Sequence, residues 1–201
     1  MGERALHVIS TEKQSTDQLA RVITEINPFI TAVHIREMNW KTIDFTMLFQ
    51  KLQADGIQQE KVIVNGMHSE EVISQAGGIH LPEREMFHIP ALKEAYPTLS
   101  IGCSVHTLES ARKAETLGAD HLMYGHIFKT ESKPGLEPRG LEQLAGICRG
   151  VSLPVIAIGG ITYGNAARVI EAGAAGIAVL SGILLAADPI KAALDYKAAL
   201  G

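Results

Sequence analysis

The feature that most constrains the fold is an alternation along almost the whole chain, in which short apolar runs are followed by longer amphipathic stretches. This order is typical of repeated βα units and a parallel sheet. Segments such as 15–26 and 107–119 have helical spacing of apolar residues, and the first follows a Ser or Thr cap. Eight apolar runs, each ending in polar or glycine residues, are predicted strands: 5–10, 32–37, 61–66, 78–82, 100–106, 121–127, 154–160 and 176–182.

The number and spacing of these units predict a single-domain (β/α)8 TIM barrel over residues 1–201. A closed barrel needs about 200 residues, so eight units leave no room for a second domain in a chain of this length. An open doubly wound sheet is the alternative fold, because periodicity does not distinguish a closed sheet from an open one.

Composition and charge exclude several classes of function. The net charge is −4 without a run of like charges, which argues against a nucleic-acid partner. The chain has neither the ~18-residue apolar stretch of a membrane span nor the apolar core of a signal peptide, so we expect a cytoplasmic protein without a membrane partner.

Cys103 and Cys148 stand far apart and are expected to be reduced thiols. The oligomeric state stays open, a homo-oligomer included.

The segment after the sixth predicted strand is unusually long. Residues 128–140 read FKTESKPGLEPRG, with two prolines, two glycines and five charges. A minimal βα turn is shorter than this. We therefore expect a loop that acts as a lid over an active site.

The ends of the last two predicted strands indicate a phosphate site. They carry Gly159-Gly160 and Ser181-Gly182, and in (β/α)8 barrels the loops after strands seven and eight commonly bind phosphate with a short extra helix. Glycine lets backbone N–H groups approach an oxyanion, and the turn after Ser181 is expected to begin such a helix. The alternative is that the glycine pair only makes a tight turn.

Five motifs fall at strand ends in one order: HIRE (34–37), IGCSVH (101–106), YGHIFKTESKPGLEPRGL (124–141), VIAIGGI (155–161) and GIAVLSGI (176–183). Together they resemble the thiamin phosphate synthase superfamily, most closely its TenI branch of thiazole tautomerases. The resemblance covers nearly the whole chain. It implies a small phosphorylated thiazole as the substrate.

Several residues that bind pyrophosphate and magnesium in the synthases of this superfamily are missing from this chain. The synthases join a pyrimidine pyrophosphate to a thiazole phosphate with magnesium. This chain has Met38 at the position of a lysine, Gly66-Met67 where an aspartate ligand follows the asparagine, and Glu83-Arg84-Glu85 in a changed acidic motif. The resemblance therefore implies that the magnesium carboxylates are lost, and we expect neither a metal nor a cofactor.

Relative to the synthases, the resemblance implies that the part of the site that binds thiazole phosphate is retained. At the end of the sixth strand, where the synthases typically have Gly-Pro, this chain has Gly125-His126. The tautomerase resemblance implies that this imidazole takes a proton from the ring carbon that bears the carboxylate and delivers one to the exocyclic carbon, which suits a group with an ordinary pKa near 6.5. Arg36 is expected to bind the substrate carboxylate, and Ser104 to face the ligand. The other expected substrate-binding residues are Thr130, Ser132, Lys133, Gly159, Gly160, Leu180 and Ser181.

Two other functions stay open: a thiamin phosphate synthase, and a non-catalytic regulator that keeps the phosphate pocket.

Among other residues, His34 and His80 are expected inside the barrel and Cys103 beneath the helices. His106 is expected to be exposed or to cap a helix. Glu37 is expected to face away from Arg36 if the strand continues through it.

Overall fold

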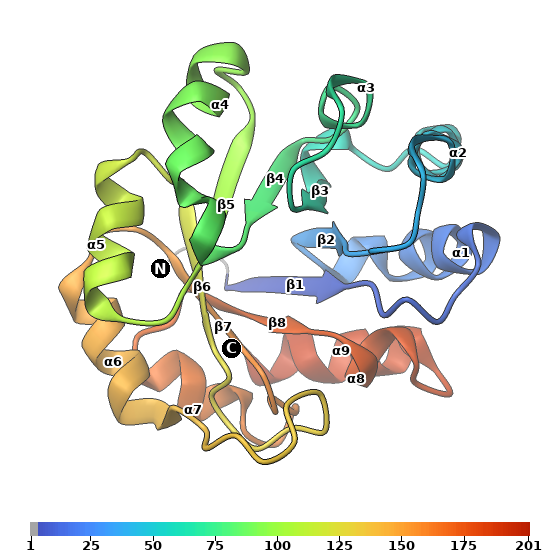
Figure 1. The fold of residues 1–201 in the computed structure, drawn as a ribbon. Coiled ribbons are helices and arrows are strands. Elements are labelled where there is room, and N and C mark those ends of the chain that lie inside the picture. The colour runs from blue at the N-terminus through green and yellow to red at the C-terminus, as the bar shows by residue number, and fades with distance from the viewer. Residues whose placement is uncertain (1–3) are drawn as a thin grey trace.

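A computed structural model describes residues 4–201, in which eight parallel strands close into a barrel (Figure 1). Each strand pairs with the next along the chain, and β8 pairs with β1. The closed barrel is thereby confirmed, and the open doubly wound sheet is wrong. The strands are β1 (Ala5–Ile9), β2 (Ala32–Ile35), β3 (Val62–Asn65), β4 (Gly78–Leu81), β5 (Ser100–Val105), β6 (His121–Gly125), β7 (Val155–Ile158) and β8 (Gly176–Val179).

Helices connect the strands and surround the barrel. The α-helices are α1 (Thr16–Ile26), α2 (Thr42–Ala54), α3 (Glu70–Ile73), α4 (Ile89–Ala95), α5 (Leu108–Thr116), α6 (Gly140–Gly150), α7 (Ala166–Glu171), α8 (Ser181–Leu184) and α9 (Pro189–Ala199). Three 3-10 helices are η1 (Asn27–Phe29), η2 (Gln59–Lys61) and η3 (Glu83–His88). None of the helices in residues 4–201 is long and apolar enough to span a bilayer.

Both expected helices are present, and each begins at a residue whose side chain caps it. Ser15 begins α1, where its hydroxyl accepts from the Gln18 amide at 3.3 Å and the Gln18 side chain accepts from the Ser15 amide at 3.1 Å. Thr107 begins α5, and its hydroxyl accepts from the Ser110 amide at 3.0 Å. These caps satisfy N–H groups that have no acceptor within the helix.

All eight predicted strands are confirmed, but each ends one to three residues earlier than expected. The polar and glycine residues at the ends of the apolar runs leave the sheet and form the loops of the barrel mouth. This difference matters most after β2, which ends at Ile35 and leaves Arg36 and Glu37 outside the strand.

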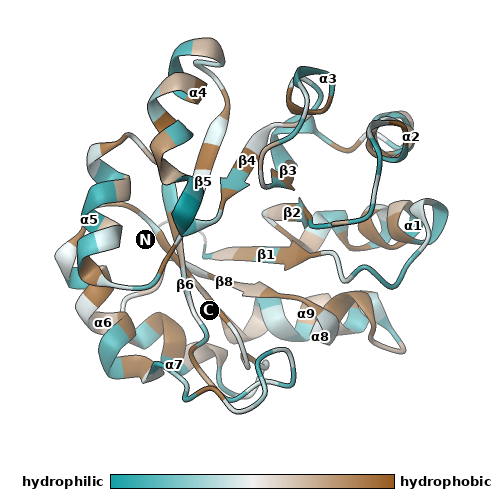
Figure 2. Cartoon of the chain, viewed as in Figure 1, coloured by the Kyte–Doolittle hydropathy of each residue, from teal (hydrophilic) through white to brown (hydrophobic). Residues whose placement is uncertain are grey.

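The apolar core has two parts. The larger part lies between the strands and the helices and includes the strand residues Leu6, Val8 and Ile35. Cys103 belongs to this layer as expected, and burial raises the pKa of its thiol to about 12. Figure 2 shows the corresponding hydropathy pattern, with hydrophobic colour on many strand segments and hydrophilic colour on outward parts of the helices. A small second cluster fills part of the barrel interior with Ile9, Met123, Ile156 and Ala178.

Four histidines fill another part of the interior: His7 on β1, His34 on β2, His80 on β4 and His121 on β6. Neighbouring rings among them have centroids 5.1 to 6.0 Å apart, which brings the four strands together across the interior. Burial is the main reason that their pKa values fall, to about 3 for His7 and His80, to about 4 for His121 and well below 6.5 for His34. The inward positions of His34 and His80 are confirmed.

Candidate active site at the barrel mouth

His126 lies at the end of β6, directly after the last strand residue, Gly125. The peptide bond between these two residues is cis. The side chain is mostly buried, with 7% of the residue exposed. Its Nε2 lies 3.3 Å from the carbonyl oxygen of Leu136 in the loop that follows. The imidazole is thus held between the strand end and the loop that was expected to act as a lid.

The glycine pair after β7 packs directly against the β6 end. Gly159 and Gly160 have φ values of +97° and +68°, which L-residues with side chains rarely adopt. A Cβ on Gly159 would lie 2.3 Å from the His126 Cβ, and one on Gly160 would lie 2.4 Å from the Lys129 carbonyl oxygen. Both glycines are therefore required for the close approach of the two strand ends.

The loop from 126 to 139 has its two ends joined by hydrogen bonds. The Arg139 amide donates to the His126 carbonyl at 2.9 Å, and the Gly140 amide donates to the Ile127 carbonyl at 3.1 Å. A loop of this length after the sixth strand was expected from the sequence. Closure of the loop over a substrate stays a prediction.

Arg139 is a site residue that sequence reasoning missed. Its Nε donates to the Gly125 carbonyl at 2.9 Å and one terminal nitrogen donates to the His106 carbonyl at 2.8 Å. The guanidinium also lies 5.5 Å from the ring centroid of Tyr124. One side chain thereby joins the ends of β5 and β6 beside the start of the His126 loop. The arginine stands inside the YGHIFKTESKPGLEPRGL motif, but its contacts depend on the loop conformation.

Three expected phosphate-site residues lie in the loop after His126. Thr130 is half-buried, and its hydroxyl lies 3.4 Å from the Ser132 amide. The Lys133 amide donates to the Thr130 carbonyl at 3.2 Å. The Ser132 and Lys133 side chains are exposed. Since Gly160 packs against Phe128 and Lys129, the start of this loop lies beside the glycine pair.

The end of β8 contributes Leu180 and Ser181. The expected extra helix is present as α8 and begins at Ser181 itself. Leu180 has an unusual backbone conformation, with φ −99° and ψ −96°, which turns the chain from the strand into this helix. Since β7 and β8 are paired, Ser181 lies at the same edge of the mouth as Gly159. The glycine pair and Ser181 therefore lie at the ends of neighbouring strands, β7 and β8, and the glycine pair also borders His126.

Ser104 lies on β5, beside β6, and is partly exposed. Its Oγ lies 2.8 Å from Nε2 of His80 in the barrel interior. This serine links the histidines of the interior to the mouth. His106, after β5, is exposed, and Thr107 is the residue that caps α5.

Arg36 lies across the mouth from His126, because β2 and β6 are four strands apart in a ring of eight. Its side chain is 44% exposed, and a guanidinium nitrogen lies 2.8 Å from Oε1 of Glu12. The structure therefore pairs Arg36 with a carboxylate of its own chain. A substrate carboxylate would compete with Glu12 for this guanidinium.

The expectation that Glu37 faces away from Arg36 applied only to a strand that continues through it, and β2 does not reach this residue. Because β2 ends at Ile35, strand alternation does not extend to this residue, and the carboxylate turns toward the end of β1. It accepts from the Glu12 amide at 3.1 Å and from the Ser10 hydroxyl. Burial raises the pKa of Glu37 above its ordinary value. In the sequence, the only indication that Glu37 belongs to the mouth was its place as the acidic residue of the HIRE motif.

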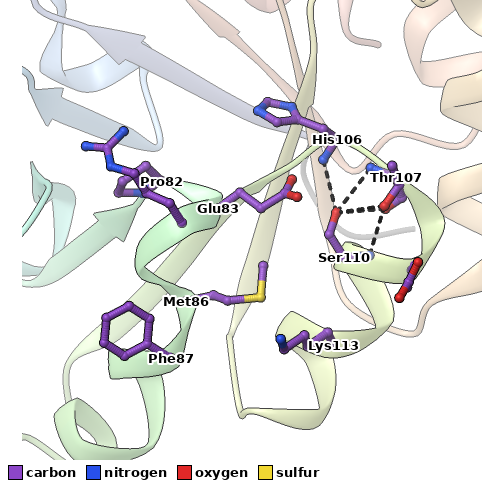
Figure 3. A pocket seen from close by; sticks show the side chains of 10 residues that line it. Pro82, Glu83, Met86, Phe87, His106, Thr107, Ser110 and Lys113 are labelled. Atoms are coloured by element: carbon purple, nitrogen blue, oxygen red, sulfur yellow. Dashed lines mark hydrogen bonds between the residues drawn. The ribbon is translucent and has the colours of Figure 1, made fainter.

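A pocket of about 670 Å³ opens beside the mouth, between η3 and α5 (Figure 3). Glu83 reaches into it from η3, facing His106 and Ser110 from the β5–α5 side. Oε2 of Glu83 is buried without a hydrogen-bond partner among the described residues. The glycine pair and Ser181 do not line this pocket.

The carboxylates near the mouth do not assemble a magnesium site. Glu12 is paired with Arg36, Glu85 is paired with Arg84, and Glu37 accepts from the β1 end. Over residues 4–201, the one grouping of three or more His, Cys, Asp or Glu side chains with the proximity of metal ligands consists of buried histidines alone. Magnesium prefers oxygen ligands, so these residues do not fit it.

Comparison with known proteins places this barrel in a family. The family described as thiamine monophosphate synthase matches residues 6–183. The thiamine-phosphate synthase of Coprothermobacter proteolyticus is 37% identical over 160 residues, 79% of this chain and 75% of that protein. The one from Haloarcula marismortui is 35% identical over 185 residues, 90% and 87% of the two chains.

A solved structure gives the same result. The thiamine phosphate pyrophosphorylase from Pyrococcus furiosus has a TM-score of 0.79 and 32% identity, over 99% of this chain and 98% of that one. The similarity therefore covers nearly the whole of both chains. The chain belongs to the thiamine monophosphate synthase family.

Proposed function

We propose that this chain is an enzyme of thiamin synthesis that binds a thiazole phosphate at the mouth and aromatises the thiazole ring by moving a proton. The observation that carries the proposal is the position of His126. A mostly buried imidazole lies beside the glycine pair at the end of β7, and the loops after β7 and β8 are the usual phosphate site of such barrels.

In the proposed reaction, the imidazole of His126 removes the proton from the ring carbon that bears the carboxylate. The electron pair shifts through the ring to the exocyclic double bond, and the exocyclic carbon takes up a proton. One proton leaves and one arrives, so neither an oxidant nor a metal is needed. At neutral pH an imidazole can first remove the one proton as a base and then deliver the other as an acid.

Substrate binding divides between two sides of the mouth. Gly159, Gly160, Leu180 and Ser181 are proposed to hold the phosphate, with Thr130, Ser132 and Lys133 on the adjacent loop. Arg36, on the opposite side, is proposed to bind the carboxylate in place of Glu12 and to stabilise charge that develops during proton removal. Ser104 is proposed to contact the ring from β5.

The second candidate is the synthase reaction, and a specific finding favours it: the relatives reported above are named thiamine-phosphate synthases or pyrophosphorylases. Judged by the names of these relatives, the comparisons support a transferase better than an isomerase. Against it stand Met38, which is 74% exposed at the lysine position, and Met67, which is 42% exposed after β3. Neither side chain can bind pyrophosphate or magnesium.

Two parallel assays decide between the reactions. The first follows conversion of the exocyclic thiazole phosphate tautomer to its aromatic form in the presence of a chelator. The second follows pyrophosphate release from pyrimidine pyrophosphate and thiazole phosphate with added magnesium. Chelator-resistant aromatisation that His126→Ala abolishes supports the proposal. Magnesium-dependent pyrophosphate release without aromatisation supports the synthase, and ligand binding without either reaction supports a regulator.

A further inference from the structure

The barrel interior contains a histidine cluster for which the proposed function has no use. The cluster consists of His7, His34, His80 and His121, from four different strands. At most 8% of each residue is exposed. His121 is the first residue of β6 and His126 follows its last. At ~3.3 Å per residue, this spacing corresponds to roughly 16 Å along the chain, so the cluster lies well below the mouth.

Three of these side chains have the mutual proximity of metal ligands. One ring nitrogen from each of His7, His34 and His121 lies within 4.8 Å of the other two. Nδ1 of His7 and Nε2 of His34 are only 3.0 Å apart. In a tetrahedral zinc site with Zn–N bonds of 2.0–2.1 Å, two ligand nitrogens are about 3.3 Å apart. Small ring shifts would therefore bring these nitrogens to the distances that a metal requires.

The ring nitrogen of His34 that faces away from the cluster has an outer partner. Its Nδ1 lies 3.2 Å from Oδ1 of Asn65. Because an amide oxygen only accepts hydrogen bonds, Nδ1 carries the proton and Nε2 presents its lone pair to the cluster. Metal-binding histidines are usually oriented in this way by an outer carbonyl or carboxylate.

Two further ring nitrogens are buried without a partner. Nε2 of His121 and Nδ1 of His80 make no hydrogen bond to any described residue. Both surround the position that a Cβ at Gly102 would occupy, at 2.2 and 2.6 Å from it. Buried polar atoms are nearly always paired, so these two nitrogens around one glycine are available to bind a ligand.

We propose that the histidine cluster is a structural site for a divalent transition metal of the zinc type, bound by His7, His34 and His121. His80 lies outside the group of nitrogens within 4.8 Å of one another and would shift toward the ion to become its fourth ligand. Imidazole nitrogens without carboxylates suit zinc, cobalt, nickel or copper and do not suit magnesium or calcium. The low pKa values of the rings leave their lone pairs free of protons at neutral pH. The bound ion would join β1, β2, β4 and β6 inside the barrel. This proposal does not depend on the proposed function.

The test uses the full chain without a histidine tag, stripped with a chelator and titrated with Co²⁺ and then Zn²⁺. The expected result is one ion per chain, a visible cobalt spectrum of tetrahedral form and a higher Tm with either metal. His121→Gln should abolish the cobalt spectrum, whereas His88→Gln on η3 should keep it. Asn65→Ala should weaken cobalt affinity about 10- to 100-fold, as loss of an outer partner does.

Gly102→Ala provides a variant that retains all four histidines and fills the space between His80 and His121 with a methyl group. If His121→Gln fails to fold, loss of cobalt binding in folded Gly102→Ala would still support the site. Stoichiometric binding that persists unchanged in Gly102→Ala or His121→Gln would overturn the proposal, as would a wild-type chain whose Tm and spectrum do not respond to either metal.

Discussion

Gly159 lies so close to His126 that a methyl group on the glycine would be 2.3 Å from the histidine Cβ. The end of β7 therefore determines where the proposed catalytic imidazole can lie. We predict that Gly159→Ala lowers kcat by at least about tenfold, because a 1 Å displacement in a site can cost more than this. The measurement is kcat for aromatisation together with the Tm.

Gly56→Ala is the matched control for this substitution. Gly56 has φ +77°, so an alanine there meets a similar backbone penalty, but nothing lies within 4 Å of its added Cβ. Equal losses of kcat in the two variants would show that backbone conformation, rather than contact with His126, causes the effect.

His126→Gln separates proton transfer from binding. General acid–base catalysis contributes about 10²- to 10⁴-fold, so we predict a loss of kcat in this range. Binding of the aromatic product, measured by calorimetry, should change little because the proposed phosphate contacts come from β7, β8 and the loop. A large loss of product affinity would instead assign His126 a binding role.

The ion pair between Arg36 and Glu12 predicts a gain of affinity on substitution. Glu12→Gln removes the competing carboxylate, and exposed pairs contribute about 0.2–1 kcal/mol, so carboxylated ligands should bind about 1.5- to 5-fold more tightly. Arg36→Ala should weaken carboxylated ligands more than the decarboxylated thiazole phosphate. Equal weakening of both ligands would exclude a carboxylate contact for Arg36.

The interior histidines predict acid sensitivity of the fold. In the unfolded chain an imidazole has a pKa near 6.5, whereas His7 and His80 titrate at about 3 and His121 at about 4 when folded. Between about pH 4 and 6.5 the unfolded state binds more protons. The free energy of unfolding therefore rises with pH in this window and is lost as the pH falls.

Urea unfolding between pH 4.5 and 7.5, with chelator present, measures this dependence. The slope near pH 5 should correspond to uptake of several protons on unfolding, approaching one for each of the four rings. His121→Gln should reduce the uptake by about one proton, and His88→Gln should reproduce the wild-type slope. A flat profile in the wild type would show that the interior rings are not neutral in the folded chain.

Strand alternation predicted much of this molecule because parallel barrels impose it on every unit. The eight strands, the helices near 15–26 and 107–119 and the cap at Ser15 follow from local pattern, and the inward positions of His34 and His80 follow from alternation. Alternation shows which way a residue faces but not which residues meet across the interior. That depends on the stagger of the strands in the closed sheet, so the meeting of His7 with His121 was not foreseen.

The site was less predictable where the chain leaves the strands. Glu37 turns inward because β2 stops two residues before it, and a single sequence does not show where a strand stops. The contacts of Arg139 depend on the path of the preceding loop. The glycine pair Gly159-Gly160 was easier to predict, because it directly follows the seventh strand, whose loop commonly binds phosphate in such barrels.

The hydrogen bonds that join His126 to Arg139 and Ile127 to Gly140 separate the excursion between them from the barrel. The tip of this excursion, away from the Gly160 contact at its start and the His126 contact at Leu136, can thus vary in length or sequence during evolution without displacing either anchor. Selection can then change which ring substituents are accepted while the proton-transfer residue keeps its place. In protein engineering, grafting a foreign segment between these two anchors is the least disruptive route to a barrel with a new substrate preference.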